Sequence, residues 1–185
     1  MEIKDLPIGD EAFKAAVLET GLTNPEDVIE IRARKQKIKS VDGLECFPNL
    51  KLLDLTRNQL TEIDVSQNLL LEELYLGSNE LEELDVSHNK ALRHLEIFVN
   101  DIESLNLEGL TQLENVYASK NDLVELNLSG NPLIDEIQLS HNEELNLLML
   151  PENHVPFIVK AENTQLDEDV KAFLTENLAS HNLKI

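Results

Sequence analysis

The segment ELEELDVSHN, residues 80–89, places the side chains of a hydrolase or a metal site close together in the chain. Asp85, Ser87 and His88 supply a carboxylate, a hydroxyl and an imidazole, the groups of a nucleophilic triad. A triad needs partners that converge from separate segments, a sharp turn under the nucleophile and donors for the oxyanion. Here the three residues are nearly consecutive and no glycine-rich loop accompanies them. We therefore expect no enzymatic activity from this segment.

The rest of the sequence contains no clear motif for binding a metal ion or a nucleotide. The five histidines do not fall at short metal-ligand spacings, and no phosphate loop, dinucleotide fingerprint or CxxC pair is present. Asp64 and Asp85 could together attract a cation such as calcium, but the glycine-rich calcium-binding repeat is absent. Cys46 precedes Pro48 in a turn-like segment, where packing is the expected role. We expect no cofactor and no metal site.

The composition favours a basic protein partner. The 185 residues include 36 acidic and 15 basic side chains, for a net charge of −21. Such a field repels nucleic acid and anionic membrane and attracts a basic surface. Hydrophobic residues make up 42% and aromatic residues 4%, which predicts an aliphatic core. No apolar run is long enough to span a membrane.

The cysteine count and the first residues favour a reducing compartment. A single cysteine cannot form an intramolecular disulfide. The segment MEIKDLPIGDEAFKAA has neither a basic stretch nor the apolar stretch of a signal peptide. We expect a cytoplasmic monomer, with secretion by a route that needs no recognisable signal as the alternative.

A repeat of about 21 residues runs through most of the chain. Its frame, LxxLxLxxN, begins at Leu50, Leu71, Leu92, Leu113 and Ile134, with weaker copies from Val28 and Val155. A similar frame begins inside each unit, at Leu60, Leu81, Ile102, Leu123 and Leu145. We call the first half of each unit the A half and the second the B half. The last two apolar positions of a frame alternate as in a strand, so they are predicted to point inward.

This pattern resembles that of bacterial leucine-rich repeat proteins, in particular the short, doubly periodic class called IRREKO. The opening segments EAFKAAVLETG and IKSVDGLECFPNLKLLDLTRN resemble the N-terminal cap and first repeat of internalin-like proteins. The resemblance covers roughly residues 10–165. It implies one domain, residues 1–185, folded as a solenoid with a parallel β-sheet on the concave face, short extended segments on the opposite face, and about six to seven repeats over residues 28–165.

The asparagine of each frame is predicted to satisfy backbone groups at the turn between strands. One ladder of asparagines is expected in the A halves and another in the B halves. The A ladder comprises Asn58, Asn79, Asn100, Asn121, Asn142 and Asn163. The B ladder comprises Asn68, Asn89, Asn131 and Asn153.

A solenoid needs covers at both ends because its core is open there. Residues 10–21 are predicted to form one capping helix, with Asp10 as N-cap, an apolar stripe and Gly21 as the stop. Residues 167–178 are predicted to form the other. The expected stripes are Phe13, Val17 and Leu18 in the first helix, and Val170, Phe173, Leu174 and Leu178 in the second. Residues 1–9 and 179–185 are expected to fray.

The outward strand positions of the A halves vary from repeat to repeat, whereas those of the B halves repeat small acidic and amide residues. In leucine-rich repeat proteins such variable positions generally bind partners. The candidate partner-binding residues are Tyr75, His94, Glu96, Phe98, Asn115, Tyr117 and Gln138. The alternative is that the tyrosines only reflect strand propensity. This outward surface is small, so a partner is expected to contact edge loops or the basic end at Arg32, Arg34, Lys35 and Arg57 as well.

The function expected from these observations is non-enzymatic protein binding through the variable strand positions. A small acidic domain of this kind suits an intracellular adaptor, or a neutraliser that occludes a basic toxin or enzyme. The alternative is an exported, internalin-like protein that binds a protein of a host or neighbouring cell.

Overall fold

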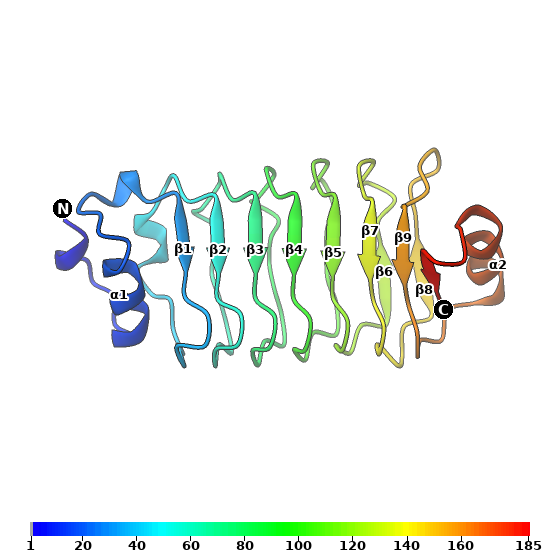
Figure 1. Ribbon diagram of the computed structural model, residues 1–185, viewed down its shortest axis with the longest axis horizontal. Coiled ribbons are helices and arrows are strands. Elements are labelled where there is room, and N and C mark those ends of the chain that lie inside the picture. The colour runs from blue at the N-terminus through cyan, green and yellow to red at the C-terminus, as the bar shows by residue number, and fades with distance from the viewer. Residues whose placement is uncertain (1) are drawn as a thin grey trace.

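Each repeat makes one turn of a parallel solenoid (Figure 1). The structure, a computed structural model, describes residues 2–185. Its main sheet has the strand order β1-β2-β3-β4-β5-β7-β9-β10, with parallel pairing throughout. The strands are β1 (Glu30–Arg32), β2 (Leu52–Asp54), β3 (Glu73–Tyr75), β4 (His94–Glu96), β5 (Asn115–Tyr117), β7 (Glu136–Gln138), β9 (Ile158–Lys160) and β10 (Leu183–Lys184). The predicted parallel solenoid is confirmed.

The B halves form much less regular structure on the other side of each coil. Only β6 (Glu125–Asn127) and β8 (Leu147–Met149) pair there, as a second, two-stranded sheet. Three short 3-10 helices, η1 (Ile3–Asp5), η2 (Pro25–Asp27) and η3 (Leu44–Cys46), lie in the first fifty residues. The expectation of short extended segments opposite the main sheet therefore holds.

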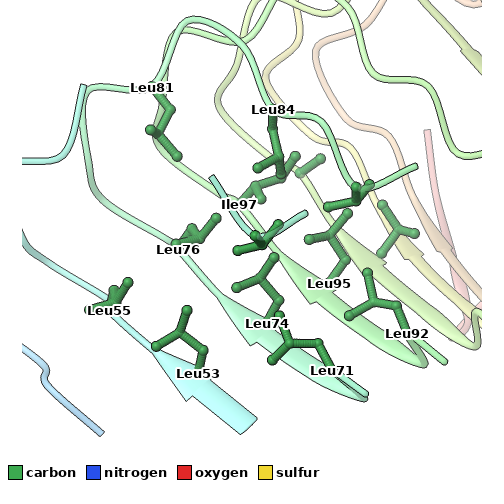
Figure 2. Close-up of a cluster of buried hydrophobic side chains, with 14 of the residues drawn as sticks. Leu53, Leu55, Leu71, Leu74, Leu76, Leu81, Leu84, Leu92, Leu95 and Ile97 are labelled. Carbon is green, nitrogen blue, oxygen red and sulfur yellow. The ribbon is translucent and has the colours of Figure 1, made fainter. Parts of the chain in front are cut away.

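The core is a column of stacked aliphatic side chains between the two halves (Figure 2). In each A half the middle strand residue and the residue two positions later point inward, as Leu74 and Leu76 do, and both are fully buried. Leu81 of the following B half meets them from the other side. Burial of each such side chain stabilises the fold by about 1.5–3 kcal/mol. The LxxLxL frame is thus the pattern of this core.

The A-half asparagines make a continuous hydrogen-bonded ladder. Asn100 is representative: its Nδ2 donates to the carbonyls of Leu76 (3.1 Å) and Ile97 (2.9 Å), and its Oδ1 accepts from the Leu81 amide (3.1 Å). The same three-bond pattern holds at Asn79, Asn121 and Asn142. Each amide thereby joins the turn of its own coil to the preceding coil and to the start of a B half.

The B-half asparagines use only one end of the amide. Asn89 Nδ2 donates to the carbonyls of Val65 (3.0 Å) and Asn68 (2.9 Å). Its Oδ1 is buried without a hydrogen-bond partner, as are the Oδ1 atoms of Asn68 and Asn131. Asn153 does not extend this ladder, because its side chain is exposed.

The turn after each A strand has a residue in the left-handed region at the same position, and the first turn has a second one, Lys37. The column comprises Lys35, Arg57, Ser78, Val99, Lys120, His141 and Asn163, with φ between 56° and 64°. Val99 is the exceptional member, because a β-branched side chain is unfavourable at positive φ.

The last coil differs from the predicted register by one residue. Val159 and Ala161 are the buried pair, whereas Ile158 and Lys160 face outward, the reverse of the expectation from a frame starting at Val155. The coil contains one additional residue, so the prediction for Asn163 was wrong. Asn163 occupies the left-handed turn position and is exposed. Thr164 takes the ladder position and donates to the Ala161 carbonyl at 2.7 Å.

The N-terminal cover includes more of the chain than predicted. Helix α1 (Glu11–Leu18) begins after its N-cap Asp10, whose Oδ1 accepts from the amides of Ala12 and Phe13, both at 2.9 Å. Asp10 Oδ2 also accepts from the Lys39 amide at 2.9 Å, which ties the helix to the first coil. Leu18 was wrongly placed in the apolar stripe and is 43% exposed.

Residues before α1 are part of the same cover. The side chains of Ile3, Leu6 and Ile8 are buried, contrary to the expected fraying. Gly43, with φ of 98°, lies so close to Ile8 that a Cβ would come within 2.8 Å of Ile8 Cγ1. The apolar residues of this segment therefore close the front of the core.

The C-terminal cover consists of α2 (Glu168–Asn177) and a returning strand. Asp167 caps α2 by accepting from the Val170 amide at 2.8 Å. Leu174 is fully buried, but Phe173 is 42% exposed and was wrongly assigned to the buried stripe. The segment after α2 was expected to fray, and instead it returns as β10, with the Ala161 amide donating to the Lys184 carbonyl at 2.6 Å.

Candidate partner-binding face

The A face is the set of outward side chains on strands β1 to β5, β7 and β9, together with the residue that follows each strand by two positions. All the candidate residues predicted from the sequence lie on it. Tyr75, His94, Glu96, Asn115, Tyr117 and Gln138 are strand residues, and Phe98 follows β4 by two positions. Parallel register places Glu96 opposite Tyr75 on one side and Tyr117 on the other.

Three rings on this face pack together. The ring centroid of His94 lies 4.8 Å from that of Tyr75, in a tilted arrangement, and 5.0 Å from that of Tyr117, edge to face. The sequence repeat predicts that the two tyrosines lie two coils apart and do not stack on each other. It does not predict that the His94 ring contacts both of them. The interaction fixes both phenol rings in the centre of the A face.

His94 is held neutral by its surroundings. Its Nε2 is buried and has no hydrogen-bond partner among residues 2–185. Burial lowers the pKa of the imidazole, and the carboxylates of Glu73 and Glu136 only partly oppose this effect. The ring therefore acts at neutral pH as a packing group between the tyrosines.

Two glutamates that were not predicted from the sequence border the aromatic cluster. The Tyr75 hydroxyl donates to Glu73 Oε2 at 2.5 Å. Glu136 accepts from Gln138 Nε2 at 2.7 Å. Burial, followed by Glu136, raises the pKa of Tyr117 to about 12, and burial and Glu73 likewise raise that of Tyr75. Both glutamates belong to the strand column two residues before that of the tyrosines. This position is the only feature of the sequence that could have predicted their part in the cluster.

Glu96 lies in the middle of the A face, and its carboxylate has no hydrogen-bond or salt-bridge partner among residues 2–185. Burial raises the pKa of its carboxyl, with a smaller opposing effect from Arg34 and a further raising effect from Asp54. Arg34 does not bond to Glu96, because its guanidinium is paired with Asp54. A half-buried carboxylate in this position is incompletely solvated.

Phe98 extends the aromatic surface across the neighbouring coil. Its ring lies over Gly77, so closely that a Cβ at Gly77 would come within 2.6 Å of Phe98 Cε1. Val99, the next residue, is 40% exposed. Together Phe98 and Val99 place apolar surface beside Glu96, at the edge where other coils carry Ser78 or Lys120.

The two edges of the A face have different charge patterns. At the edge before the strands, opposite charges on neighbouring coils pair, as in Lys51–Glu72 (2.7 Å) and Arg93–Glu114 (2.6 Å). At the edge after the strands, Lys35, Arg57 and Lys120 are exposed and form no salt bridge within the described chain.

The basic end is only partly available for a partner. Arg32 Nε donates to Glu30 Oε2 at 3.0 Å, and Arg34 is paired with Asp54. Lys35 and Arg57 remain exposed beside these pairs. Half of the predicted basic end is thus compensated within the protein itself.

The B face has a structural reason for its repetitive composition. Asp64, Asp85, Asn106 and Asn127 occupy one column, and each side-chain Oδ1 accepts from the amide two residues later, at 2.8–3.0 Å. In these four coils the turn uses a short carboxylate or amide, whereas the next coil has Met149 at this position. Within the four coils the column therefore has little freedom to vary for a partner.

The segment that suggested a triad is one of these turns. Asp85 accepts from the Ser87 amide, and Ser87 Oγ lies 3.2 Å from His88 Nδ1. The Asp85 carboxylate makes no hydrogen bond to His88, so the three groups are not connected in the order that a triad needs.

An open groove of about 920 Å³ runs beside this column, and its charged lining consists of acidic residues. Among residues 2–185, no three His, Cys, Asp or Glu side chains group as metal ligands. Cys46 is half-buried against the core, and burial raises the pKa of its thiol. In the same residues, no helix has the length and apolar character needed to cross a membrane.

Several proteins of known structure resemble the chain. The functional domain of InlJ from Listeria monocytogenes has a TM-score of 0.82 and 21% identity, over 91% of this chain and 39% of that one. Internalin C2 from Listeria monocytogenes has a TM-score of 0.62 and 17% identity, over 95% and 93%. A chain of the LRIM1/APL1C complex has a TM-score of 0.69 and 21% identity, over 80% and 29%. No family profile and no curated protein matches the sequence.

These similarities establish a shared fold. The chain spans well under half of the InlJ domain and of the matched chain in the LRIM1/APL1C complex. The InlJ domain includes a cysteine ladder, whereas the present chain has one cysteine and stacks asparagines instead.

Proposed function

We propose that this chain, a leucine-rich repeat protein by its fold, binds a protein partner through the A face and has no catalytic role. The observation that carries the proposal is the contrast between the two faces. The A face varies from coil to coil and packs two tyrosine rings against His94, with Glu96 in register between the two tyrosine strands. The B face repeats one turn and uses its polar side chains to make it.

The composition of the A face suits a binding centre. Tyrosines held by neighbouring side chains lose little freedom on binding and offer both apolar and polar contact. The strand surface alone is roughly 350 Å², well below the ~800 Å² per partner of a standard interface. A partner therefore also covers an edge, and the edge with Val99 offers exposed apolar surface next to Phe98.

The proposed partner has a basic surface, and nucleic acid and membrane are not proposed as ligands. The net charge of −21 favours a cationic protein and opposes a polyanion. We propose an intracellular adaptor or a neutraliser of a basic toxin or enzyme, acting as a monomer. An exported protein that binds a host or neighbouring-cell protein is the second candidate, and the fold shared with InlJ and internalin C2 favours it.

Site-specific crosslinking tests the binding face. A photoreactive residue at Ser119 on the A face is compared with one at Asn127 on the B face, in cells of the source organism. We expect a discrete crosslinked protein from position 119 alone, and its loss in a Tyr75→Ala/Tyr117→Ala background. Equal crosslinking from both positions would contradict the A face as the binding face, and fractionation of the same cells separates the intracellular from the exported role.

The absence of catalysis has a separate test. Turnover that disappears in Ser87→Ala, in any hydrolase assay of the purified protein, would contradict the proposal. We expect Ser87→Ala to behave as wild type, because Asp85 bonds to the Ser87 amide and not to His88, so the three groups do not form a triad.

A further inference from the structure

The Glu96 carboxylate is the least compensated charge in the centre of the A face. It is half-buried, and within residues 2–185 it accepts no hydrogen bond and pairs with no Lys or Arg. The nearby cation, Arg34, is already bound to Asp54. A carboxylate that has lost part of its hydration and gained no donor is a site that an external cation would complete.

Aromatic residues neighbour Glu96 on both adjacent strands and on its own strand. Tyr75 and Tyr117 flank it in register on the neighbouring strands, and Phe98 follows it two residues later on the same face. Their ring orientations are fixed by His94 and by the space over Gly77. Aromatic faces beside a carboxylate attract a cation through the ring quadrupoles as well as the formal charge.

The surrounding charges reinforce this preference. Glu73 and Glu136 lie one column away, and neither pairs with a Lys or Arg of the described chain. Both interact with tyrosine hydroxyls, which makes those phenols more electron-rich. Each tyrosine thus has two carboxylates near it, Glu73 and Glu96 at Tyr75, and Glu136 and Glu96 at Tyr117.

We infer that this area binds a cationic side chain of the protein partner, seated over Glu96 and next to Tyr75 and Tyr117. An arginine fits best, because its planar guanidinium can stack on a phenol ring while two N–H groups face the carboxylate. The inference rests on the proposed function and specifies what the partner presents to the A face.

The protein contains its own probe for this site. It has two tyrosines and no tryptophan, so tyrosine fluorescence and the tyrosine ring signals in NMR report on Tyr75 and Tyr117 alone. We would titrate the whole protein with N-acetyl-arginine amide, N-acetyl-lysine amide and N-acetyl-citrulline amide. Citrulline keeps the shape of arginine and removes its charge.

We expect saturable changes with both cations, at millimolar dissociation constants, and no saturable change with citrulline. Glu96→Gln preserves the side-chain size and is expected to weaken arginine binding at least tenfold. The matched control, Glu125→Gln on exposed strand β6, is expected to change the dissociation constant by less than twofold. Melting curves of both variants would test whether they remain folded.

Two results would overturn the site. One is an equal response to arginine and citrulline, and the other is unchanged arginine binding in Glu96→Gln. The test also separates this inference from the proposed function. A protein partner that binds wild type and Glu96→Gln alike, but not Tyr75→Ala/Tyr117→Ala, would refute the cation site and leave the A face as the binding face.

Discussion

The A and B halves of each repeat have nearly the same sequence frame and very different structures. Both bury their frame leucines, but the A halves make seven strands of the main sheet and the B halves make only β6 and β8. The A-half asparagines bond through both ends of the amide, whereas three B-half asparagines leave Oδ1 unpaired. The B strand column is also used for turns. Order and freedom to vary therefore belong to the same half, because the A turns are secured by the ladder, with Asp54 the one outward strand residue described as bonding the amide two residues later.

The largest expected effect tests the two ladders against each other. Asn100→Leu leaves the Leu81 amide and two carbonyls unpaired, so we expect it to lower the free energy of unfolding by about 3–5 kcal/mol. Asn89→Leu strands two carbonyls but also removes an unpaired oxygen, so a smaller loss of about 1–3 kcal/mol is expected. Chemical denaturation of both variants measures the difference, and equal losses would contradict it.

A gain of stability is expected at the one strained turn of the A halves. Val99→Asn replaces a β-branched residue at φ of 56° with one that tolerates this region, and should raise the free energy of unfolding by about 1 kcal/mol. Ser78→Val, at the same position of the preceding coil, is the reverse control and should lower it by a similar amount. If the A face binds a partner as proposed, Val99→Asn should also weaken that binding, because it removes exposed apolar surface beside Phe98.

A smaller effect is expected where Phe98 covers Gly77. Gly77→Ala should be nearly neutral or mildly destabilising in wild type, because the Phe98 ring must move away. In a Phe98→Ala background the same change should stabilise by roughly 0.4–1 kcal/mol, since the clash is gone and the unfolded chain is less flexible. The sign change in this double-mutant cycle measures their coupling.

The smallest expected effect concerns pH. Because burial lowers the pKa of His94 in the folded protein, the unfolded chain takes up a proton first as pH falls below the ordinary value of 6.5. The folded state therefore loses stability as pH falls through 6.5, and the loss ends below the folded pKa. His94→Gln should flatten this part of the melting-temperature profile, and His88→Gln on the exposed B face should not.

Much of this architecture can be predicted from residue spacing, because a solenoid repeats one local solution. The inward leucines and the A ladder follow from the frame alone, as at Leu74 and Asn79. The last coil could not be aligned in this way. Asn163 is the asparagine that the frame predicts for the ladder, but one extra residue in the coil puts Thr164 at the ladder position instead. Only packing decides between two registers that differ by one residue.

The candidate site shows a different limit. The column pattern places Tyr75 and Tyr117 on one surface, but it does not show the direction in which a side chain leans. The leaning of the rings brings His94 into contact with both, and the same geometry makes Glu73 part of the cluster. The prediction of the buried helix face was wrong for a related reason. Phe173 lies on the predicted apolar stripe of α2, but only part of that stripe is buried.

The returning strand β10 has a consequence for association between molecules. An open sheet edge is a template on which another chain can add a strand and begin aggregation. Here the last full strand, β9, is covered by Leu183 and Lys184 of the same chain. The outer edge of β10 offers the backbone of only two residues, next to a helix. The tail therefore protects the edge of β9 from pairing with a strand of another molecule.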